Sequence, residues 1–465
     1  MWEKMIPAVK ISGGIFDGLL FYIGVLGLLL LVGTLLRLKV GFFKKYYIPA
    51  SLIAGFLGLI IGPDCLKIIP SDMNAAWSGM PGRLISVVFA PMLMGVAILN
   101  PRKYLDISAP SWFFGWIGAA IQVAVPFVVT GLILIPIWGV NPMFGTIVEV
   151  GFSGGHGTAA GMVEVYNHLN WPDGASLGMV SATVGLIVGI VTGMIFINYC
   201  IRKGYTSVVK STEELKKSED DVIPEEKRIA SSISTINTNI VDGFALHIAF
   251  IGLAILLGWF MQKFVGQYIK GFPLFPMAMI GGFIIQCVIS KTRWANILDR
   301  GTFAKIQGMA LEFLIVAAVA TIQIPVVIAY AGPLFILMVT ATALMLWYFF
   351  YIGPRMFHED WVEHAIVQYG TLTANAAIGL MLLRSVDPEM KTNAYLGYAL
   401  RAPFSSPFIG GGLVTSLLPI FALSFGPTTA GLIALGVCAA LFLACYLCGW
   451  LHKPSYGKTA LKPEL

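Results

Sequence analysis

The chain alternates between long apolar stretches and short polar segments. An α-helix needs about 20 apolar residues to cross a bilayer, and several of the stretches exceed this length. We predict eleven crossings, at 16–36, 47–62, 83–99, 110–138, 174–201, 243–263, 273–290, 303–324, 327–352, 393–423 and 427–450. The pattern therefore predicts an all-α polytopic membrane protein.

Two further apolar segments, 142–168 and 362–384, are dense in Gly, Thr, Asn or His. Glycine costs roughly 1 kcal/mol relative to alanine in a helix, and broken backbone at membrane depth is tolerated only where protein or a water-filled cavity surrounds it. If both segments were full crossings, the charged stretch 204–242 would lie outside the cell. We therefore predict two re-entrant hairpins, each of which enters the bilayer and returns to the same face.

Charge fixes the expected orientation. Hydrophobic residues make up 57% of the 465 residues and charged residues only 12%, where an ordinary soluble domain has roughly 25% charged residues. With the N-terminus outside, 23 of the 30 Lys and Arg residues lie inside, 6 lie outside and Arg401 lies within the membrane, as the positive-inside rule requires. We predict a multi-pass protein of the cell (inner or plasma) membrane with a cytoplasmic C-terminus. The net charge of +6 then requires no nucleic-acid partner.

The two halves of the chain resemble each other in order. Segment 48–56 matches 275–283, Pro on Pro and Gly on Gly, and 175–178 after the first hairpin matches 394–397 after the second. Because five crossings and a hairpin form each copy, the second copy is inverted, and the hairpin tips can meet. Broken elements at matching places in inverted halves point to a transporter's binding site; the alternative is chance similarity between apolar helices. The predicted organisation is a first repeat at 1–203, a cytosolic charged linker at 204–242, an inverted repeat at 243–424, and an extra transmembrane helix with a cytosolic tail at 425–465.

The hairpin tips supply the candidate site. Sodium needs hard oxygen ligands, which hydroxyls, amides and carbonyls at a helix break provide, and unpaired N–H groups at the arm ends favour a substrate carboxylate. We predict substrate contacts from Ser153, Gly154, Gly155, His156, Gly157, Thr158, Thr371, Thr373, Asn375 and Arg401. The predicted sodium ligands are Ser153, Thr158, Thr373, Asn375 and Ser405. The alternative is that these side chains satisfy local backbone groups.

Arg401 falls near mid-membrane, in a helix that Pro403, Pro407 and the triple glycine 410–412 should interrupt. An intramembrane Arg is costly and should have a partner. Two partners stay open. One is a substrate carboxylate, which the guanidinium fork would bind through two hydrogen bonds, and the other is Glu312, in a structural ion pair or a coupling role.

Other ionisable residues have more than one reading. His156 could donate to a substrate carboxylate, relay a proton or hydrogen-bond the opposite hairpin, and a structural or orienting role is favoured. Glu149, on the first arm of the first hairpin, could neutralise a cation or lie exposed near the mouth. Glu363 and His364 open the second hairpin and are interpreted as surface residues or a gate.

Two motifs resemble those of the glutamate:sodium symporter family: Tyr-Ile-Pro-Ala at 47–50 and Ser-Gly-Gly-His-Gly-Thr at 153–158. The resemblance covers nearly the whole chain. It implies a homodimer of inverted five-helix repeats and an elevator-like cycle that moves an amino acid with sodium. The second hairpin departs from the family's Gly- and Pro-containing string ending in Ala-Asn-Met, since 369–377 reads Tyr-Gly-Thr-Leu-Thr-Ala-Asn-Ala-Ala. The predicted function is sodium-coupled symport of glutamate or of a related amino acid or carboxylate, with an anionic or zwitterionic substrate.

Two other functions remain open. One is a proton-coupled or exchange carrier for another carboxylate. The other, more remote, function is an intramembrane serine protease, because 151–154 fits Gly-x-Ser-Gly with Ser153 as nucleophile. No His stands in the expected downstream arrangement to act as the base of such a nucleophile. Cys445 and Cys448 form a C-x-x-C without a second pair, so no transition metal is predicted. The protein is expected to be no enzyme and to need no cofactor besides sodium as the coupling ion.

Overall fold

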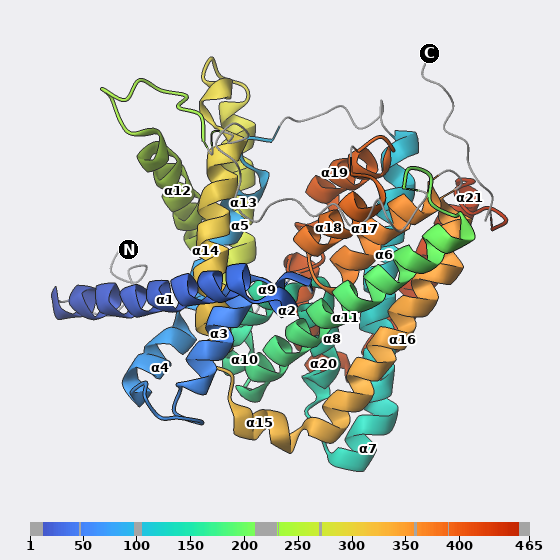
Figure 1. Cartoon of the computed structure of the whole chain (residues 1–465), viewed down its shortest axis with the longest axis horizontal. Helices are drawn as coiled ribbons and strands as arrows, with labels where there is room; N and C mark the ends of the chain where they lie inside the picture. The colour runs from blue at the N-terminus through green and yellow to red at the C-terminus, as the bar shows by residue number, and fades with distance from the viewer. Residues whose placement is uncertain are drawn as a thin grey trace. The chain divides into compact units, whose positions relative to one another are not determined.

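The structure, a computed structural model, describes residues 13–45, 48–96, 105–209, 230, 232–268, 272–357, 360–388 and 390–454. Over these residues the chain forms helices and turns and contains no β-strand, as predicted (Figure 1). Tyr47 of the first family motif and most of the predicted linker 204–242 lie outside the described residues.

Among the described residues, seven helical segments are long and apolar enough to span a membrane, and each coincides with a predicted crossing. One of them, α6, continues through a π-helical turn, η4, into α7. The elements are α1 (Gly13–Lys39), α6 (Leu105–Val129) with η4 (Thr130–Leu134) and α7 (Ile135–Trp138), α11 (Asp173–Lys203), α12 (Gly243–Val265), α14 (Arg300–Ala320), α16 (Ala331–Met356) and α21 (Pro427–Leu447).

The other four predicted crossings are short or divided helices, so the count of eleven stays a prediction. Helix ends leave backbone N–H and C=O groups without intrahelical partners, so ligands can bind to these groups. The elements are α3 (Ala50–Ile60), α5 (Pro81–Phe89) followed by η2 (Ala90–Leu93), α13 (Leu274–Ile289), and α19 (Ala394–Ser405) followed by α20 (Leu413–Phe425). The division between α19 and α20 occurs where the Pro and Gly residues predict it.

Shorter elements complete the chain. Five form the predicted first hairpin: η5 (Pro142–Gly145), α8 (Thr146–Val148), η6 (Glu149–Ser153), α9 (Gly155–Gly161) and α10 (Val163–His168). Two form the second: α17 (Trp361–Thr373) and α18 (Ala376–Val386). The remaining ones are α2 (Gly41–Lys45), α4 (Ser71–Gly79), η9 (Ala295–Ile297) and α15 (Ile324–Ala329).

The chain folds into two compact units, and each draws on both halves of the sequence. Unit 1 comprises 1–98, 160–176 and 221–326, and unit 2 comprises 99–159, 177–220 and 327–465. In Figure 1 unit 2 accordingly combines cyan and green helices, such as α6 and α11, with orange and red ones, such as α17 and α19. The predicted boundaries at 203, 242 and 424 follow the repeat along the sequence and stay a prediction.

Unit 1 contains the segments that the sequence repeat aligns, and they pack in corresponding ways. Helix α3 packs on α1 and α14, and α13 packs on α12 and α5. Gly55 of α3 faces Val319 of α14, while the aligned Gly282 of α13 faces the carbonyl oxygen of Ala90 in η2, and a Cβ at either glycine would push the helices apart. Small residues permit such close helix crossings. The inverted repeat itself stays a prediction.

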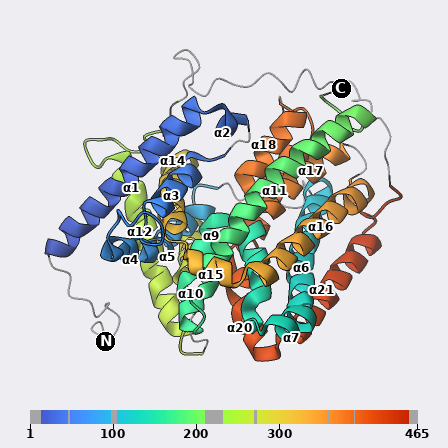
Figure 2. The same ribbon diagram turned by 60° about the horizontal axis from the view of Figure 1, so that its bottom comes forward.

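Unit 2 is assembled around α6, which packs against α16, α17, α19 and α21. Figure 2 shows α16 and α21 next to α6. Gln122 of α6 donates from Nε2 to the carbonyl oxygen of Leu372 in α17 at 2.7 Å. Tyr348 of α16 donates from its hydroxyl to the carbonyl oxygen of Phe114 in α6 at 2.6 Å. These hydrogen bonds, made where water is excluded, fix α16 and α17 against α6.

Candidate functional site

The first hairpin is a broken helix whose break follows from its glycines. Its first arm runs through η5 and α8 and ends in the π-helical turn η6, which the N–H of Gly154 closes on the carbonyl oxygen of Glu149 at 2.9 Å. Gly155 then adopts φ +66°, the left-handed region that glycine enters without strain. Single π-helical turns of this kind are frequent at functional sites. The glycine-rich segment therefore forms the backbone break that the sequence predicts.

The second hairpin consists of α17 and α18, which pack on each other across a two-residue break at Ala374 and Asn375. The helices approach closely at two glycines, since an ideal Cβ at Gly370 would lie 2.7 Å from the Cα of Gly379. Asn375 caps α18 by accepting the N–H of Ile378 on Oδ1 at 3.0 Å, a typical N-cap contact. A helical hairpin thus stands at the predicted place, while its re-entrant path into and out of one membrane face stays a prediction.

The two breaks lie against each other in unit 2. An ideal Cβ at Gly155 would lie 2.7 Å from the carbonyl oxygen of Ala374 and 3.7 Å from the Cβ of Asn375. Only glycine leaves room for this backbone-to-backbone approach. The tips of the two hairpins therefore meet, as the sequence predicts.

A third break, between α19 and α20, joins them. It spans 406–412 and contains Gly410 and Gly411 with φ values of +67° and +109°. Gly410 lies beside the first break, since an ideal Cβ there would be 3.3 Å from the carbonyl oxygen of Ser153 and 3.5 Å from its Oγ. Thr158 donates to the carbonyl oxygen of Gly410 over a long 3.4 Å. Three interruptions of helical structure therefore meet in one place.

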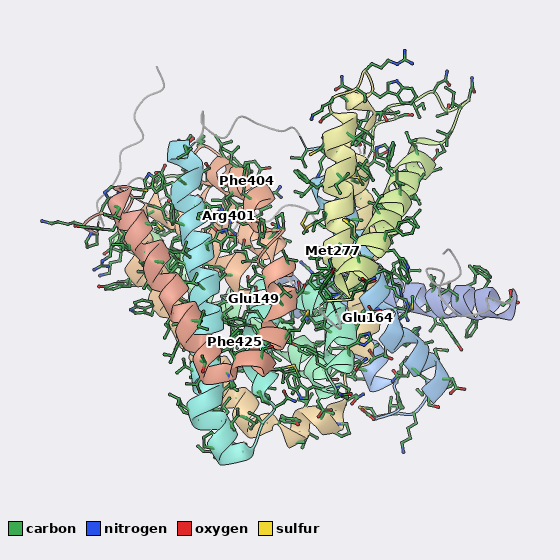
Figure 3. The ribbon with its side chains drawn as sticks, turned by 180° about the vertical axis from the view of Figure 1, so that it is seen from behind. Glu149, Glu164, Met277, Arg401, Phe404 and Phe425 are labelled. Carbon is green, nitrogen blue, oxygen red and sulfur yellow. The ribbon has the colours of Figure 1, made fainter. Side chains whose placement is uncertain are left out.

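A buried carboxylate lies at this meeting point. Glu149 is 2% exposed, and its Oε1 accepts the N–H of Gly410 at 3.0 Å and the hydroxyl of Thr415 at 2.9 Å. Its Oε2 is buried and makes no hydrogen bond to any described residue. The sequence left two interpretations of Glu149 open, and the one that placed it exposed near the mouth of the hairpin is wrong. Glu149 is labelled within unit 2 in Figure 3.

Helix α11 passes both hairpin tips on a row of small residues. Gly151 packs on Ser181, Gly185 on the carbonyl oxygen of Thr373, and an ideal Cβ at Gly189 would lie 2.6 Å from the hydroxyl of Thr373. Ser181, Gly185 and Gly189 are spaced by four residues and so lie on one helix face. Sequence reasoning missed this face, although the small-residue spacing, continued at Gly193, is a known signal for close helix packing.

The predicted ligands of the second tip are engaged by their own helix. Thr371 donates its hydroxyl to the carbonyl oxygen of Val367 at 2.8 Å, and Thr373 donates to that of Tyr369 at 2.7 Å. Asn375 uses Oδ1 for the cap of α18. These contacts are those of the alternative reading, in which the side chains satisfy local backbone. A ligand role for Thr371, Thr373 and Asn375 stays a prediction.

His156 is buried and bonded to α11. Its Nε2 lies 3.0 Å from Oγ1 of Thr183, and that hydroxyl donates to the carbonyl oxygen of Met179 at 3.0 Å. When the hydroxyl proton of Thr183 is used for Met179, Nε2 of His156 is the donor of this pair. This contact fits the structural role favoured from the sequence.

Arg401 is buried at 5% exposure on α19, packed against Gly115 of α6, where any Cβ would overlap the guanidinium. The guanidinium carbon lies 5.4 Å from the ring centroid of Tyr398. Nε and Nη1 are buried and have no hydrogen-bond partner among the described residues. Glu312 is exposed on α14 and belongs to unit 1. The pairing of Arg401 with Glu312 stays a prediction.

Other buried polar atoms lie along α6, α17 and α19. Gly397 of α19 packs between Ser111 of α6 and His364 of α17, since an ideal Cβ there would lie 2.9 Å from the Ser111 hydroxyl and 3.5 Å from the His364 ring. Within the described part of the chain, buried atoms without a hydrogen bond include Ser111 Oγ, His364 Nδ1, both amide atoms of Gln368, and Ser405 Oγ. Glu363 is also buried, accepting the N–H of Ser207 at 2.7 Å. The expectation of a surface position is therefore wrong for Glu363, whereas His364 is half-buried; sequence position could not reveal which helices cover these residues.

Comparisons with known proteins identify the family of the chain. Residues 19–373 match the family model described as Sodium/glutamate symporter. The chain is similar to the sodium/glutamate symporters of Escherichia coli (strain K12) and Shigella flexneri, each 22% identical over 345 residues, which cover 72% of this chain and 80% of the symporter. A structure of the sodium proton antiporter MjNhaP1 from Methanocaldococcus jannaschii aligns with 86% of this chain and 99% of that chain, at 16% identity and a TM-score of 0.38, too low to support an argument.

Proposed function

Because the chain belongs to the sodium/glutamate symporter family, we propose that it moves glutamate or a related amino acid or carboxylate across the membrane together with sodium. Membership places the protein among secondary transporters and not among enzymes, which removes the serine-protease alternative. The observation that carries the proposal is the meeting of three helix breaks beside the buried Glu149. Ions and small anions need such freed backbone groups when they are bound away from water.

The substrate is proposed to bind where the hairpin tips meet. The N-terminal end of α9 and the capped start of α18 direct helix N–H groups toward the breaks, and such ends favour carboxylates. Arg401, in the same unit, has buried nitrogen atoms that lack a partner in the described chain. A buried guanidinium without a counter-charge is costly. A substrate carboxylate would supply that charge through the bidentate geometry that arginine offers.

The transport cycle is proposed to be elevator-like, in a homodimer with its N-terminus outside. Both broken tips, Glu149 and Arg401 belong to unit 2, so one compact unit contains the proposed site. Each unit is formed from both sequence halves, which is what a movable body and a supporting body built from an inverted repeat require. The lipid bilayer and a small substrate are the partners that the family implies.

A thermal-shift screen of the purified protein tests this function, with glutamate, other amino acids and dicarboxylates, each in sodium and in choline. We expect at least one anionic or zwitterionic compound to raise the melting temperature more in sodium than in choline. Uptake of that compound into proteoliposomes should then require a sodium gradient. Uptake that instead follows a proton gradient without sodium would overturn sodium coupling and favour the proton-coupled or exchange carrier.

A further inference from the structure

We propose that Glu149 supplies the charged ligand of the coupling sodium ion, at a site between η6 and the 406–412 break; this inference rests on the proposed function. The sodium ligands predicted from the sequence are hydroxyl and amide groups and do not include this carboxylate. The site is assigned from four features of the structure: the free oxygen of Glu149, its uncharged surroundings, the neighbouring oxygen atoms and the local backbone.

The two oxygens of the Glu149 carboxylate differ. Oε1 is saturated by two donors, the N–H of Gly410 and the hydroxyl of Thr415. Thr415 in turn accepts the N–H of Gly411 at 3.0 Å, which locks it as the donor to Glu149. Oε2 has neither a donor nor an acceptor among the described residues, although it is buried. The surrounding groups therefore orient the carboxylate by one oxygen and leave the other free for a ligand.

The neighbours that hold the carboxylate are uncharged. Its two hydrogen-bond partners are a backbone amide and a hydroxyl. Removing a carboxylate from water is costly unless an opposite charge approaches it. Buried ionisable residues inside membrane proteins are accordingly a mark of ion pathways. A monovalent cation at Oε2 would provide the missing charge.

The oxygen atoms beside Gly410, the residue whose N–H binds Oε1 of Glu149, suit sodium. Ser153 brings its carbonyl oxygen and its hydroxyl next to Gly410, and the carbonyl oxygen of Gly410 faces the hydroxyl of Thr158. Carbonyl, hydroxyl and carboxylate oxygens are the ligands that hard cations prefer. A metal cation bound to Oε2 would be ligated by these oxygens together with the carboxylate.

The backbone at Glu149 is specialised for this task. Glu149 begins the π-helical turn η6, so its own carbonyl oxygen bonds five residues ahead, to Gly154. Single π-helical turns inside helices are frequent at functional sites. The same turn ends at Ser153, whose oxygens face Gly410. One turn thus carries the carboxylate and two further candidate ligands.

The test is a sodium titration of Glu149→Gln in the full-length protein. Glutamine keeps an oxygen that can accept from Gly410 and Thr415 but removes the charge. The purified protein is titrated with sodium, balanced with choline, and the midpoint of thermal stabilisation is read. We expect the Glu149→Gln midpoint to rise by about tenfold or more, because one partner of a buried charge pair is lost. Glu164→Gln makes the same chemical change in the half-buried α10 (Figure 3) and should keep the wild-type midpoint.

Each outcome decides the proposal. A wild-type midpoint in Glu149→Gln overturns it. The proposal is also overturned if uptake by Glu149→Gln keeps its sodium dependence but loses its pH dependence, because Glu149 would then be a proton site. If Glu149→Gln is not monodisperse by size exclusion, Glu149→Asp decides: the shortened side chain should also raise the midpoint, and an unchanged value overturns the proposal. A wild type that does not respond to sodium overturns the proposed function itself, together with this inference.

Discussion

Gly155 lies against the carbonyl oxygen of Ala374, so closely that an ideal Cβ at Gly155 would be 2.7 Å from that oxygen. Gly155 also has φ +66°. Two independent requirements, close approach and left-handed backbone, therefore fall on one residue of the first hairpin. The contact joins segments more than 200 residues apart in the sequence. It is where the backbones of the two hairpin tips touch.

Replacing Gly155 by alanine should disrupt this contact. The Cβ meets the Ala374 oxygen, and non-glycine residues in the left-handed region cost about 1–3 kcal/mol. We expect a lower melting temperature and transport reduced by about tenfold or more, because tip geometry is lost. Gly436→Ala in α21 is the matched control, since nothing lies within 4 Å of its Cβ position. Equal stability and transport in the two variants would show that the tips do not need this contact.

Gly189→Ala tests the packing of α11 on the second hairpin. The new Cβ would lie 2.6 Å from the hydroxyl of Thr373, so α17 or α11 must shift. Overpacking of this kind costs typically about 1–3 kcal/mol. We expect a drop in melting temperature that Thr373→Ser does not relieve but Thr373→Ala partly does. No drop in Gly189→Ala alone would contradict the contact.

Arg401→Lys tests whether the guanidinium holds a substrate carboxylate. Lysine keeps the charge but loses the fork, and we expect substrate affinity to fall by about tenfold or more. Gly115→Ala should have the same effect with Arg401 intact, because its Cβ would displace the guanidinium. Substrate binding is measured by the substrate-dependent thermal shift at saturating sodium.

Arg384→Lys, at an exposed position on α18, is the control for this pair and should bind as the wild type does. Unchanged affinity in both Arg401→Lys and Gly115→Ala would favour a structural role for Arg401, such as the pairing with Glu312 predicted from the sequence.

His156→Gln separates a structural role from proton relay. The glutamine amide can still donate to Thr183, so we expect uptake and its pH profile to be retained. His156→Ala leaves the Thr183 hydroxyl without this donor and should cost about 1–3 kcal/mol in the free energy of unfolding. Thr183→Val on top of His156→Ala should add little, because the pair is already broken. A pH profile that changes in His156→Gln would indicate proton transfer instead.

Local patterns predicted much of the site. The glycine-rich segment 151–158 predicted a helix break because glycine is unfavourable in a helix. The structure has the break at Gly154 and Gly155. The Pro and Gly residues after Arg401 likewise predicted the interruption between α19 and α20. The predicted ligand roles of the Thr371 and Thr373 hydroxyls are less well supported, because residue type alone does not tell whether a hydroxyl binds a ligand or a backbone carbonyl of its own helix.

The burial of Glu149 could not be predicted from its neighbours in the sequence. In the sequence it is one acidic residue near a predicted membrane mouth, and both an exposed and a buried position were open. It is buried because Gly410 and Thr415, about 260 positions later, fold over it. The small-residue face of α11 is a similar case: the spacing is visible in the sequence, but its neighbours are not.

Sequence patterns alone predict the helical membrane class, the places of seven long helices, the second helical hairpin and the family to which the chain belongs. These follow from hydrophobic length, glycine cost and short motifs, all of which act over neighbouring residues. The three-dimensional fold was needed to see that three breaks meet, that Glu149 is enclosed with one oxygen free of hydrogen bonds, and that Arg401 lies on Gly115. Such contacts depend on which distant segments pack together, and hydrophobicity, which has no direction, does not specify them.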